Sequence, residues 1–344
     1  MSTELATRGS DFAPLLSTMR ESGLLRPRRV RYAVMIGTDL IVLALIWIGV
    51  YALGRSWWAL FLAVPAAVFT TRVMFIGHDA GHRQVARTAR VNRLIALVVG
   101  DLITGVGSRW WVDKHNRHHA NPNVVGRDPD VDPGALVWTS EQVADRRTRF
   151  SLWASRHQAR LFFPLLLAEA LNLTVTSFLA ARRGRDRLLL CLHIAVYFGG
   201  LALMLGPGRA AVFVLIHQGL LGLHLGCSFA PNHKGMPMSD PETRQDDFLR
   251  KQVLTSRNVT GGRATDWLLG GLNYQIEHHL FPSMPRPNLR HAQSLVRAHC
   301  AALGVSYAEA PFRTSMAQAL RHLDTVDDIA VARGSGDLSA NRPR

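Results

Sequence analysis

The sequence predicts an all-α integral membrane protein, and three observations support this prediction. Apolar residues make up 48% of the 344-residue chain, and they gather into long runs instead of being spread evenly. Arginine-rich segments alternate with short connections that carry few charges. Histidines cluster at helical spacing near the ends of the apolar runs. Together these patterns favour membrane-crossing helices with a polar, histidine-bearing cap on one side of the bilayer.

Four apolar runs come close to the length of about 20 residues that a helix needs to cross the hydrocarbon layer. They lie at 33–53, 57–76, 188–205 and 210–227. A fifth run, 161–180, is weaker because it contains Glu169 and Asn172, and the run 94–106 is short. We expect the helix at 161–180 to lie along the membrane interface, and the helix at 94–106 to be interfacial or buried.

The distribution of arginine predicts the orientation. Basic clusters flank the first pair of runs and precede the second pair. They consist of Arg26, Arg28, Arg29 and Arg31, then Arg83, Arg87, Arg90 and Arg93, then Arg182, Arg183, Arg185 and Arg187. By the positive-inside rule these clusters are cytoplasmic. The four runs then form two hairpins, parity leaves 161–180 on the cytoplasmic side, and both termini and every histidine cluster share that side. The prediction is four transmembrane helices in two hairpins with a cytoplasmic helical cap.

The chain divides into a cytoplasmic N-terminal segment, a membrane domain, and a C-terminal helix followed by a disordered tail. The expected boundaries are 1–30, 31–311 and 312–344. Two amphipathic helices are expected at 288–303 and 315–330, because Asn288 and Ser315 are favoured residue types at helix starts. The tail is expected from about residue 332, where the apolar pattern ends.

The overall charge and the cysteines limit the classes of partner. A net charge of +15 should attract anionic lipid head groups and acidic proteins. Nucleic acid is not expected, because no nucleic-acid-binding motif appears. The three scattered cysteines argue against a disulfide framework and fit a reducing compartment.

Three histidine clusters repeat one geometry. His78 and His82 are four residues apart, His115 is followed by His118 and His119 at the third and fourth positions, and Gln275 is followed in the same way by His278 and His279. On a helix, residues at these offsets share one face. The set is too regular for an accident of composition.

Such faces, if they meet, build a cage of imidazoles that binds iron, zinc or copper in preference to magnesium or calcium. Together with His233, eight imidazoles are available, whereas one tetrahedral zinc needs at most four ligands. Eight is about the right number for two metal ions. The cytoplasmic cap is therefore expected to carry the metal site. A pair of redox metals above a membrane suggests oxidation of a lipid by dioxygen.

The histidine segments carry a family resemblance. The first reads H-D-A-G-H from His78, the second K-H-N-R-H-H from Lys114, and the third N-Y-Q-I-E-H-H-L-F-P from Asn273; F-A-P-N-H-K-G-M-P from Phe229 is also similar. In order and spacing the chain resembles the membrane fatty acid desaturases, from about residue 24 to residue 311. The third segment is similar to that of front-end desaturases.

The resemblance implies a non-haem centre of two iron ions, with dioxygen as co-substrate and two delivered electrons, that inserts a double bond into an acyl chain. The implied iron ligands are His78, His82, His115, His118, His119, His233, His278 and His279. It implies a membrane lipid or acyl-CoA as substrate, with the acyl chain in an apolar tunnel beneath the metals. A bacterial-type cytoplasmic membrane is the expected location.

Some positions depart from that pattern or extend it. Gln275 stands where stearoyl-CoA desaturases have a histidine, and we expect it to be a weak ligand or an outer contact. Asp79, Glu277 and Asp113 are candidates to hold imidazole N–H groups. Asn232 is expected to point elsewhere on its helix. About 30 residues before the first span are too few for a fused haem domain. A separate ferredoxin or flavoprotein reductase is therefore expected to supply electrons.

Other interpretations stay open at this stage. A membrane hydroxylase would use the same centre, and a zinc-binding receptor or transporter would use the histidines without redox chemistry. Trp110 and Trp111 are expected to anchor at the membrane interface, or else to line the substrate entrance. Arg109, Lys114 and Lys234 are candidates to bind the phosphates of an acyl carrier. The position and geometry of the double bond, the chain length, the acyl carrier and the oligomeric state are not predicted.

Overall fold

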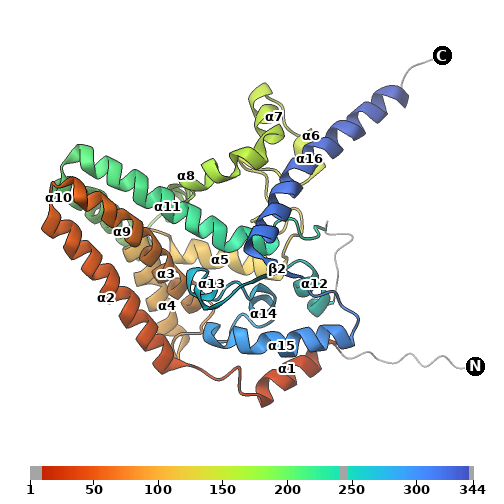
Figure 1. The fold of residues 1–344 in the computed structure, drawn as a ribbon, viewed down its shortest axis with the longest axis horizontal. Coiled ribbons are helices and arrows are strands. Elements are labelled where there is room, and N and C mark those ends of the chain that lie inside the picture. Colours follow the sequence, from red (N-terminus) through yellow and green to blue (C-terminus); the bar gives the residue numbers. More distant parts are fainter. Residues whose placement is uncertain (1–9, 240–246, 341–344) are drawn as a thin grey trace, which may run out of the picture.

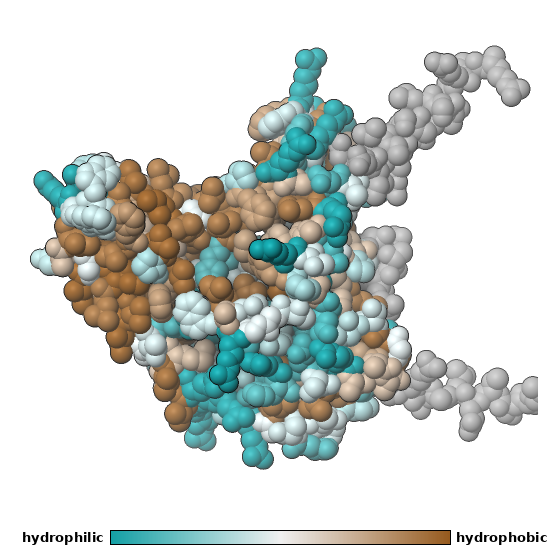
Figure 2. Space-filling view, in the orientation of Figure 1, coloured by the Kyte–Doolittle hydropathy of each residue, from teal (hydrophilic) through white to brown (hydrophobic). Residues whose placement is uncertain are grey.

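The computed structural model describes residues 10–239 and 247–340, and these are mostly helical (Figure 1). Helices rich in apolar residues extend to one side, and short polar helices gather at the other (Figures 1 and 2). The predicted all-α class with apolar helices able to span a membrane is confirmed.

Two helical hairpins form the apolar part. Their elements are α2 (Arg29–Leu53), the 3₁₀ helix η1 (Trp57–Leu62), α3 (Ala63–Gly81), α9 (Arg185–Ile194), the π-helix η3 (Ala195–Gly199), α10 (Gly200–Leu205) and α11 (Pro207–His233). The hairpins pack together at their loop ends, where Val50, Ala59, Leu205 and Ala210 belong to one buried cluster. Outward-facing side chains such as Ile41, Leu45 and Ile48 are exposed, as expected for a lipid-facing surface.

The number of spans is not settled by length and composition. Among the described residues, five helical segments are long and apolar enough to cross a membrane, because α8 (Gln158–Ala180) meets the same criteria as the four predicted spans. The four-span count and the interfacial position of 161–180 therefore remain predictions.

A sharp bend separates the second histidine helix from the segment before it. Helix α4 (Ala89–Leu97) and the π-helix η2 (Val98–Thr104) form one segment. The helix direction bends by 112° between this segment and α5 (Ser108–Ala120). Gly105 allows the bend with a φ of +73°, and a Cβ there would lie 2.5 Å from Nε2 of His193. The side chain of Asp101 accepts a hydrogen bond from the Ser108 N–H at the start of α5. The predicted short helix at 94–106 is thus one arm of a bent pair.

Helix α8 packs closely across α11. A Cβ at Gly222 would lie 2.2 Å from the Leu166 carbonyl oxygen, so only glycine permits this approach of the two backbones. The opposite face of α8 exposes Val175 and Leu179. Helices α6 (Ser140–Ala144) and α7 (Arg149–Arg156) precede it.

The polar cap is built from helices and two short strands, and one buried cluster in it includes Leu15, Leu249, Ile276 and Leu289. The elements are α1 (Phe12–Glu21), α12 (Phe248–Leu254), β1 (Asn258–Thr260), α13 (Arg263–Leu268), α14 (Gln275–Leu280), α15 (Arg286–Ala302), β2 (Glu309–Pro311) and α16 (Phe312–Ala340). The two strands pair in parallel, with Asn258 opposite Glu309.

The C-terminal predictions need correction. Helix α15 begins at Arg286, and Asn288 bonds the Leu24 carbonyl and the Arg28 side chain instead of capping the helix. Helix α16 begins at Phe312, before Ser315. It continues to Ala340 although a disordered tail is predicted from about residue 332, because the next proline, Pro343, lies beyond it and a helix once formed propagates. Residues 341–344 lie outside the described residues.

Candidate metal centre

The eight predicted histidines come from four helices and meet at one place. His78 lies in the last turn of α3, His82 is its C-cap residue, and His233 ends α11. Helix α5 supplies His115, His118 and His119, and α14 supplies His278 and His279. Segments up to about 200 residues apart in sequence therefore converge, as the spacing of the clusters predicts.

The ring nitrogens fall into two groups. In the first, His78, His82, His115 and His278 each present one nitrogen, and these nitrogens all lie within 4.8 Å of one another. In the second, His118, His233 and His279 do the same. Each group has the size of a site for one metal ion.

His119 lies between the two groups. Its Nε2 atom is 3.1 Å from Nε2 of His115 in the first group, and its ring stacks on His279 of the second with centroids 4.2 Å apart. The two groups are therefore neighbours, with one shared histidine between them.

The residues fit metal ions, because several buried ring nitrogens have no hydrogen-bond partner among the described residues. This holds for Nε2 of His78, Nδ1 of His119, Nε2 of His279 and both nitrogens of His278. Unpartnered buried polar atoms are costly and rare in folded proteins. Burial, followed by the other imidazoles, lowers the pKa of His82, His278 and His279 well below the usual value, which keeps the rings neutral and able to bind a metal.

The far nitrogens of several rings bond to protein acceptors. Nδ1 of His118 donates to the Asp128 carboxylate at 2.9 Å, and Nδ1 of His279 donates to Oε1 of Gln252 at 2.9 Å. Nδ1 of His233 donates to the Thr255 carbonyl at 3.1 Å, and that of His78 lies 3.2 Å from Asp79. Such contacts hold each ring in one orientation and one tautomer.

Sequence reasoning predicted Asp79 but missed Asp128 and Gln252. The acidic run D-P-D that begins at Asp128, nine residues after the second cluster, was an available signal. No local pattern marks Gln252, which follows a segment outside the described residues and reaches the centre from α12.

The remaining candidates have different surroundings. The Gln275 amide lies 2.9 Å from Nε2 of His233, beside the second group. Glu277 contacts no histidine; it accepts hydrogen bonds from Asn258 and Tyr307, and burial raises its pKa to about 7. Asp113 is 75% exposed and pairs with Arg117 on the surface. Of the three carboxylates that were candidates to hold imidazoles, Asp79 alone lies beside a histidine ring in the described part of the chain.

Asn232 also differs from its prediction. Its side-chain amide donates to Oε1 of Gln275 at 3.3 Å, so it points toward the centre because helix α11 ends there and α14 crosses its last turn.

Asp79 does more than contact His78. Its other oxygen accepts from Nε of Arg286 at 2.7 Å, which ties the end of α3 to the cap helix α15.

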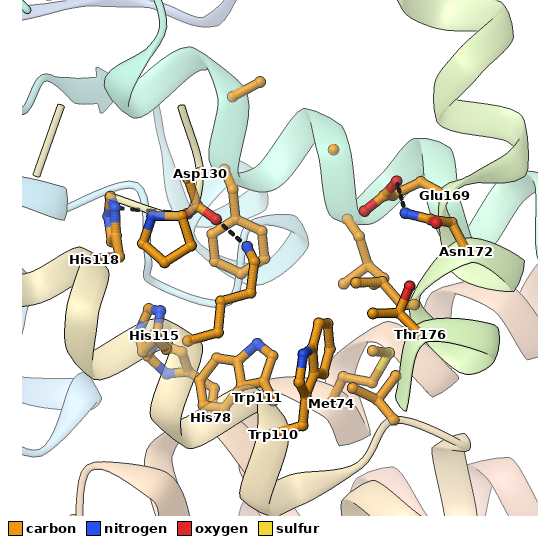
Figure 3. A pocket seen from close by; sticks show the side chains of 18 of the residues that line it. Met74, His78, Trp110, Trp111, His115, His118, Asp130, Glu169, Asn172 and Thr176 are labelled. Atoms are coloured by element: carbon orange, nitrogen blue, oxygen red, sulfur yellow. Dashed lines mark hydrogen bonds and ion pairs between the residues drawn. The ribbon is translucent and has the colours of Figure 1, made fainter. Parts of the chain in front are cut away.

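A cavity of about 550 Å³ adjoins the histidines (Figure 3). Its walls come from α3, α5, α8 and α11, and His78, His115 and His118 lie on one side of it. The lining is mainly apolar and includes Met74, Trp110, Trp111, Leu166, Leu225, Gly226 and Phe229. Trp111 stacks on His115 with centroids 4.4 Å apart. Trp110 and Trp111 both line the cavity, and whether they also anchor at the membrane interface stays a prediction.

Polar groups lie on two sides of the cavity, one beside His118 and one on α8 (Figure 3). Nζ of Lys114 pairs with the Asp130 carboxylate, and Nζ of Lys234 donates to the Asp130 carbonyl at 2.7 Å. From α8, Glu169 accepts a hydrogen bond from Asn172 (Figure 3). The two lysines that were candidates for phosphate binding are thus both bonded to Asp130, and Arg109 pairs with Asp186.

Comparison with known proteins decides the family. Residues 55–311, which carry all three histidine clusters, match the family model described as fatty acid desaturase. The chain belongs to the fatty acid desaturase family. The predicted resemblance and enzyme class are confirmed: this desaturase is an oxidoreductase that acts on fatty acyl chains.

Several curated relatives share this assignment. The desaturase is 29% identical to fatty acid desaturase 3 of Bos taurus, over 91% of this chain and 72% of that protein. It is 32% identical to the acyl-lipid (9-3)-desaturase of Physcomitrium patens, over 74% of this chain and about half (51%) of that protein. The Delta(8)-fatty-acid desaturase 2 of Arabidopsis thaliana is 28% identical over 76% of this chain and 62% of its own length.

Proposed function

We propose that the desaturase inserts a double bond into an acyl-lipid or acyl-CoA chain with dioxygen and two electrons, at a centre of two iron ions. The observation that carries the proposal is the convergence of two histidine groups on the wall of one acyl-sized cavity. The proposed ligands are His78, His82, His115, His118, His119, His233, His278 and His279. A family match alone would not choose among the 15 histidines of the chain.

The overall reaction is balanced as follows: one –CH₂–CH₂– unit, one dioxygen, two electrons and two protons give one –CH=CH– unit and two waters. When bound, the iron pair supplies the oxidising power to remove hydrogen from unactivated methylenes, which no ordinary side chain has. The chain's own residues bind the acyl group, exclude water and hold the imidazoles in place.

The apolar cavity wall positions the substrate. Trp111, Leu166 and Phe229 give an acyl chain apolar contacts within the same cavity that His78, His115 and His118 reach. Burial of each methylene contributes about 0.8 kcal/mol and drives the chain into the cavity. Because a fixed chain presents the same carbons to the histidines, the shape of this wall is expected to set the position of the double bond.

The outer contacts keep each imidazole ready to bind metal. Asp128, Gln252 and the Thr255 carbonyl accept the far N–H of His118, His279 and His233. The near nitrogen of each ring then carries a free lone pair directed at the second group. We infer that Gln275 is an outer contact or weak ligand of that group, since its amide can rotate to present its oxygen.

We also propose that the histidine centre and both termini lie in the cytoplasm, with four spans in two hairpins. The contacts of α8 support its interfacial position. At its start, Gln158 donates to the Leu323 carbonyl of cap helix α16, and beyond its end Asp186 pairs with Arg109 of the histidine helix α5. The start of α8 and the start of the next helix, α9, thus both contact elements on the metal side. The arginine clusters favour the cytoplasm for that side.

This proposal also includes the division of the chain into 1–30, 31–311 and 312–344, the separate ferredoxin or flavoprotein donor and the bacterial-type membrane. The orientation is tested with reporters fused after Ala340, one that is active only in the cytoplasm and one that is active only outside it. Only the cytoplasmic reporter should give a signal. An extracytoplasmic signal would contradict the orientation without affecting the ligand assignment.

One experiment tests the chemistry. Protein purified in lipid nanodiscs should contain two iron ions per chain and convert a labelled acyl chain into the alkene when dioxygen and a reductase system are supplied. Acyl-CoA and acyl-phospholipid are tested separately, which identifies the carrier. A hydroxylated product would assign the chain to the hydroxylases, and one zinc ion without turnover would overturn the proposal.

A further inference from the structure

Helix α7 (Arg149–Arg156) presents an aromatic and basic face that the proposed reaction does not use. Phe150 is 75% exposed and Trp153 is 48% exposed, although both are large apolar side chains. Their rings stack with centroids 5.9 Å apart, and Trp153 stacks in turn on His157 at 5.0 Å. The aromatic side chains therefore form one ordered row on the outside of the helix.

The same face is strongly basic. The segment 146–160 contains five arginines and no acidic residue. Arg149 lies four residues before Trp153 on α7, which places it on the same face, and Arg160 lies in the first turn of α8, beyond the break at His157. Both are exposed. The opposite side of α7 is small and polar, and Ser155 is buried there.

The local geometry holds this face outward. Thr148 and Ser151 form a capping box at the start of α7, with the Ser151 N–H 3.0 Å from the Thr148 hydroxyl oxygen. Helix α7 packs against α8 and α16 through its inner side. In Figure 1 it lies at the edge of the molecule beside α6 and the start of α8, and in Figure 2 hydrophobic and hydrophilic atoms lie side by side there.

We propose that α7 binds the surface of the bilayer, with Phe150 and Trp153 among the lipid head groups and the neighbouring arginines paired with the phosphates of anionic lipids. An apolar row beside long cationic side chains is the pattern of helices that lie in the membrane interface. Each arginine near an anionic leaflet adds attraction.

Continuity with α8 favours a membrane over a protein as the occupant. Only His157 separates α7 from α8, a helix long and apolar enough to lie in a bilayer. The outward residues Phe163 and Leu167 on the first turns of α8 are themselves exposed. The aromatic row of α7 thus continues into an exposed apolar face of α8, and the inference rests on the proposed topology, which places that face against lipid.

The test uses full-length protein in nanodiscs and does not depend on turnover. Cys191, Cys227 and Cys300 are replaced by serine or alanine, and a spin label is attached at Phe150→Cys. A matched label at Ser294→Cys, an exposed position on cap helix α15, serves as the control. Collision with lipid-soluble oxygen and with a water-soluble nickel chelate is measured for each label.

In discs that contain anionic lipid, the ratio of the oxygen to the nickel collision rate should be at least about threefold higher for the label at position 150 than for the label at position 294. The ratio should fall in purely zwitterionic discs. Arg149→Gln with Arg160→Gln should abolish that dependence on lipid charge. The same charge change at Arg20 and Arg313, both exposed elsewhere, should leave it unchanged.

Three results would overturn the proposal. The first is a label at position 150 as accessible to nickel as the label at position 294 in every disc. The second is the same label depth with and without anionic lipid. The third is protection that appears only when an acidic electron-transfer protein is added, which would assign the face to a protein partner.

Discussion

Helix α11 carries buried histidines in two different settings, one in its apolar half and one at its metal-side end. In the apolar half, Nδ1 of His217 lies 2.6 Å from the Tyr197 hydroxyl oxygen, and Nε2 lies 3.3 Å from that of Thr70. Both nitrogens are therefore bonded to neighbouring helices. At the end of the same helix, only Nδ1 of His233 has a backbone partner, and Nε2 faces Gln275 and the second histidine group.

The contrast extends to other histidines. His193 bonds the Leu102 carbonyl and His224 bonds the Leu268 carbonyl, so both join one helix to another segment. At the centre, by contrast, His278 is fully buried and neither ring nitrogen has a partner. Burial is thus common to both kinds. What separates a packing histidine from a candidate ligand is a buried lone pair that the protein itself leaves unbonded.

The largest effect is expected from removing a ligand. His118→Ala or His279→Ala should reduce the alkene product to background and lower the iron content, because each belongs to the three-histidine group. The protein should remain in the membrane, since the spans are untouched. Product analysis and metal analysis check this. Normal iron content in either variant would show that the second group does not bind metal.

The next effect concerns the outer acceptor. Asp128→Ala should lower activity or metal affinity by about 10–100-fold, because it frees the His118 ring to rotate. Asp113→Ala is the matched control, an acid from α5 that is exposed and contacts no histidine. Steady-state rates and iron retention under a chelator measure the difference. Equal losses in both variants would argue for a general charge effect.

A smaller effect is expected from a change at Gly226, which lies between His217 and His233 where α11 lines the cavity. Gly226→Ala places a Cβ 2.3 Å from the Leu166 side chain, which has to move within the cavity wall. The preference for acyl-chain length should then shift by about tenfold, the usual effect of one methylene. Gly219→Ala on the same helix meets Leu167 only at 3.6 Å and should not change it. A mixture of acyl chains analysed by product measures both.

The smallest effect on catalysis is expected from removing the partner of the packing histidine His217. Tyr197→Phe removes the hydroxyl that bonds His217 and should lower the free energy of unfolding by about 1–2 kcal/mol. Activity should stay within about twofold and the iron content should not change, because no ligand is touched. Thermal unfolding of the purified protein tests stability. Loss of iron in this variant would contradict the distinction between His217 as a packing residue and His233 as a candidate ligand.

Several features of the centre were predictable because they depend on short-range spacing. The histidines of α3, α5 and α14 stand on common helical faces, and the structure brings all of them together with His233. The apolar runs likewise became helices at the expected places, since length and hydropathy alone decide which segments can cross a bilayer.

Other features had no local signature. Gln252 reaches His279 from α12, and Trp111 stacks on His115 in the cavity wall. Gly226 meets Leu166 only because α8 crosses α11 at that level. Each contact depends on the angle at which two elements pack, and that angle comes from many side chains together.

By itself, then, the sequence predicted which histidines would come together and which segments would be apolar helices, because periodicity and length act along a single stretch of chain. Only the tertiary structure decided how the imidazoles divide into two groups, which acceptors hold them and what shape the adjoining cavity has. Those properties arise where segments far apart in sequence pack together, and no spacing within one segment encodes the distance to another.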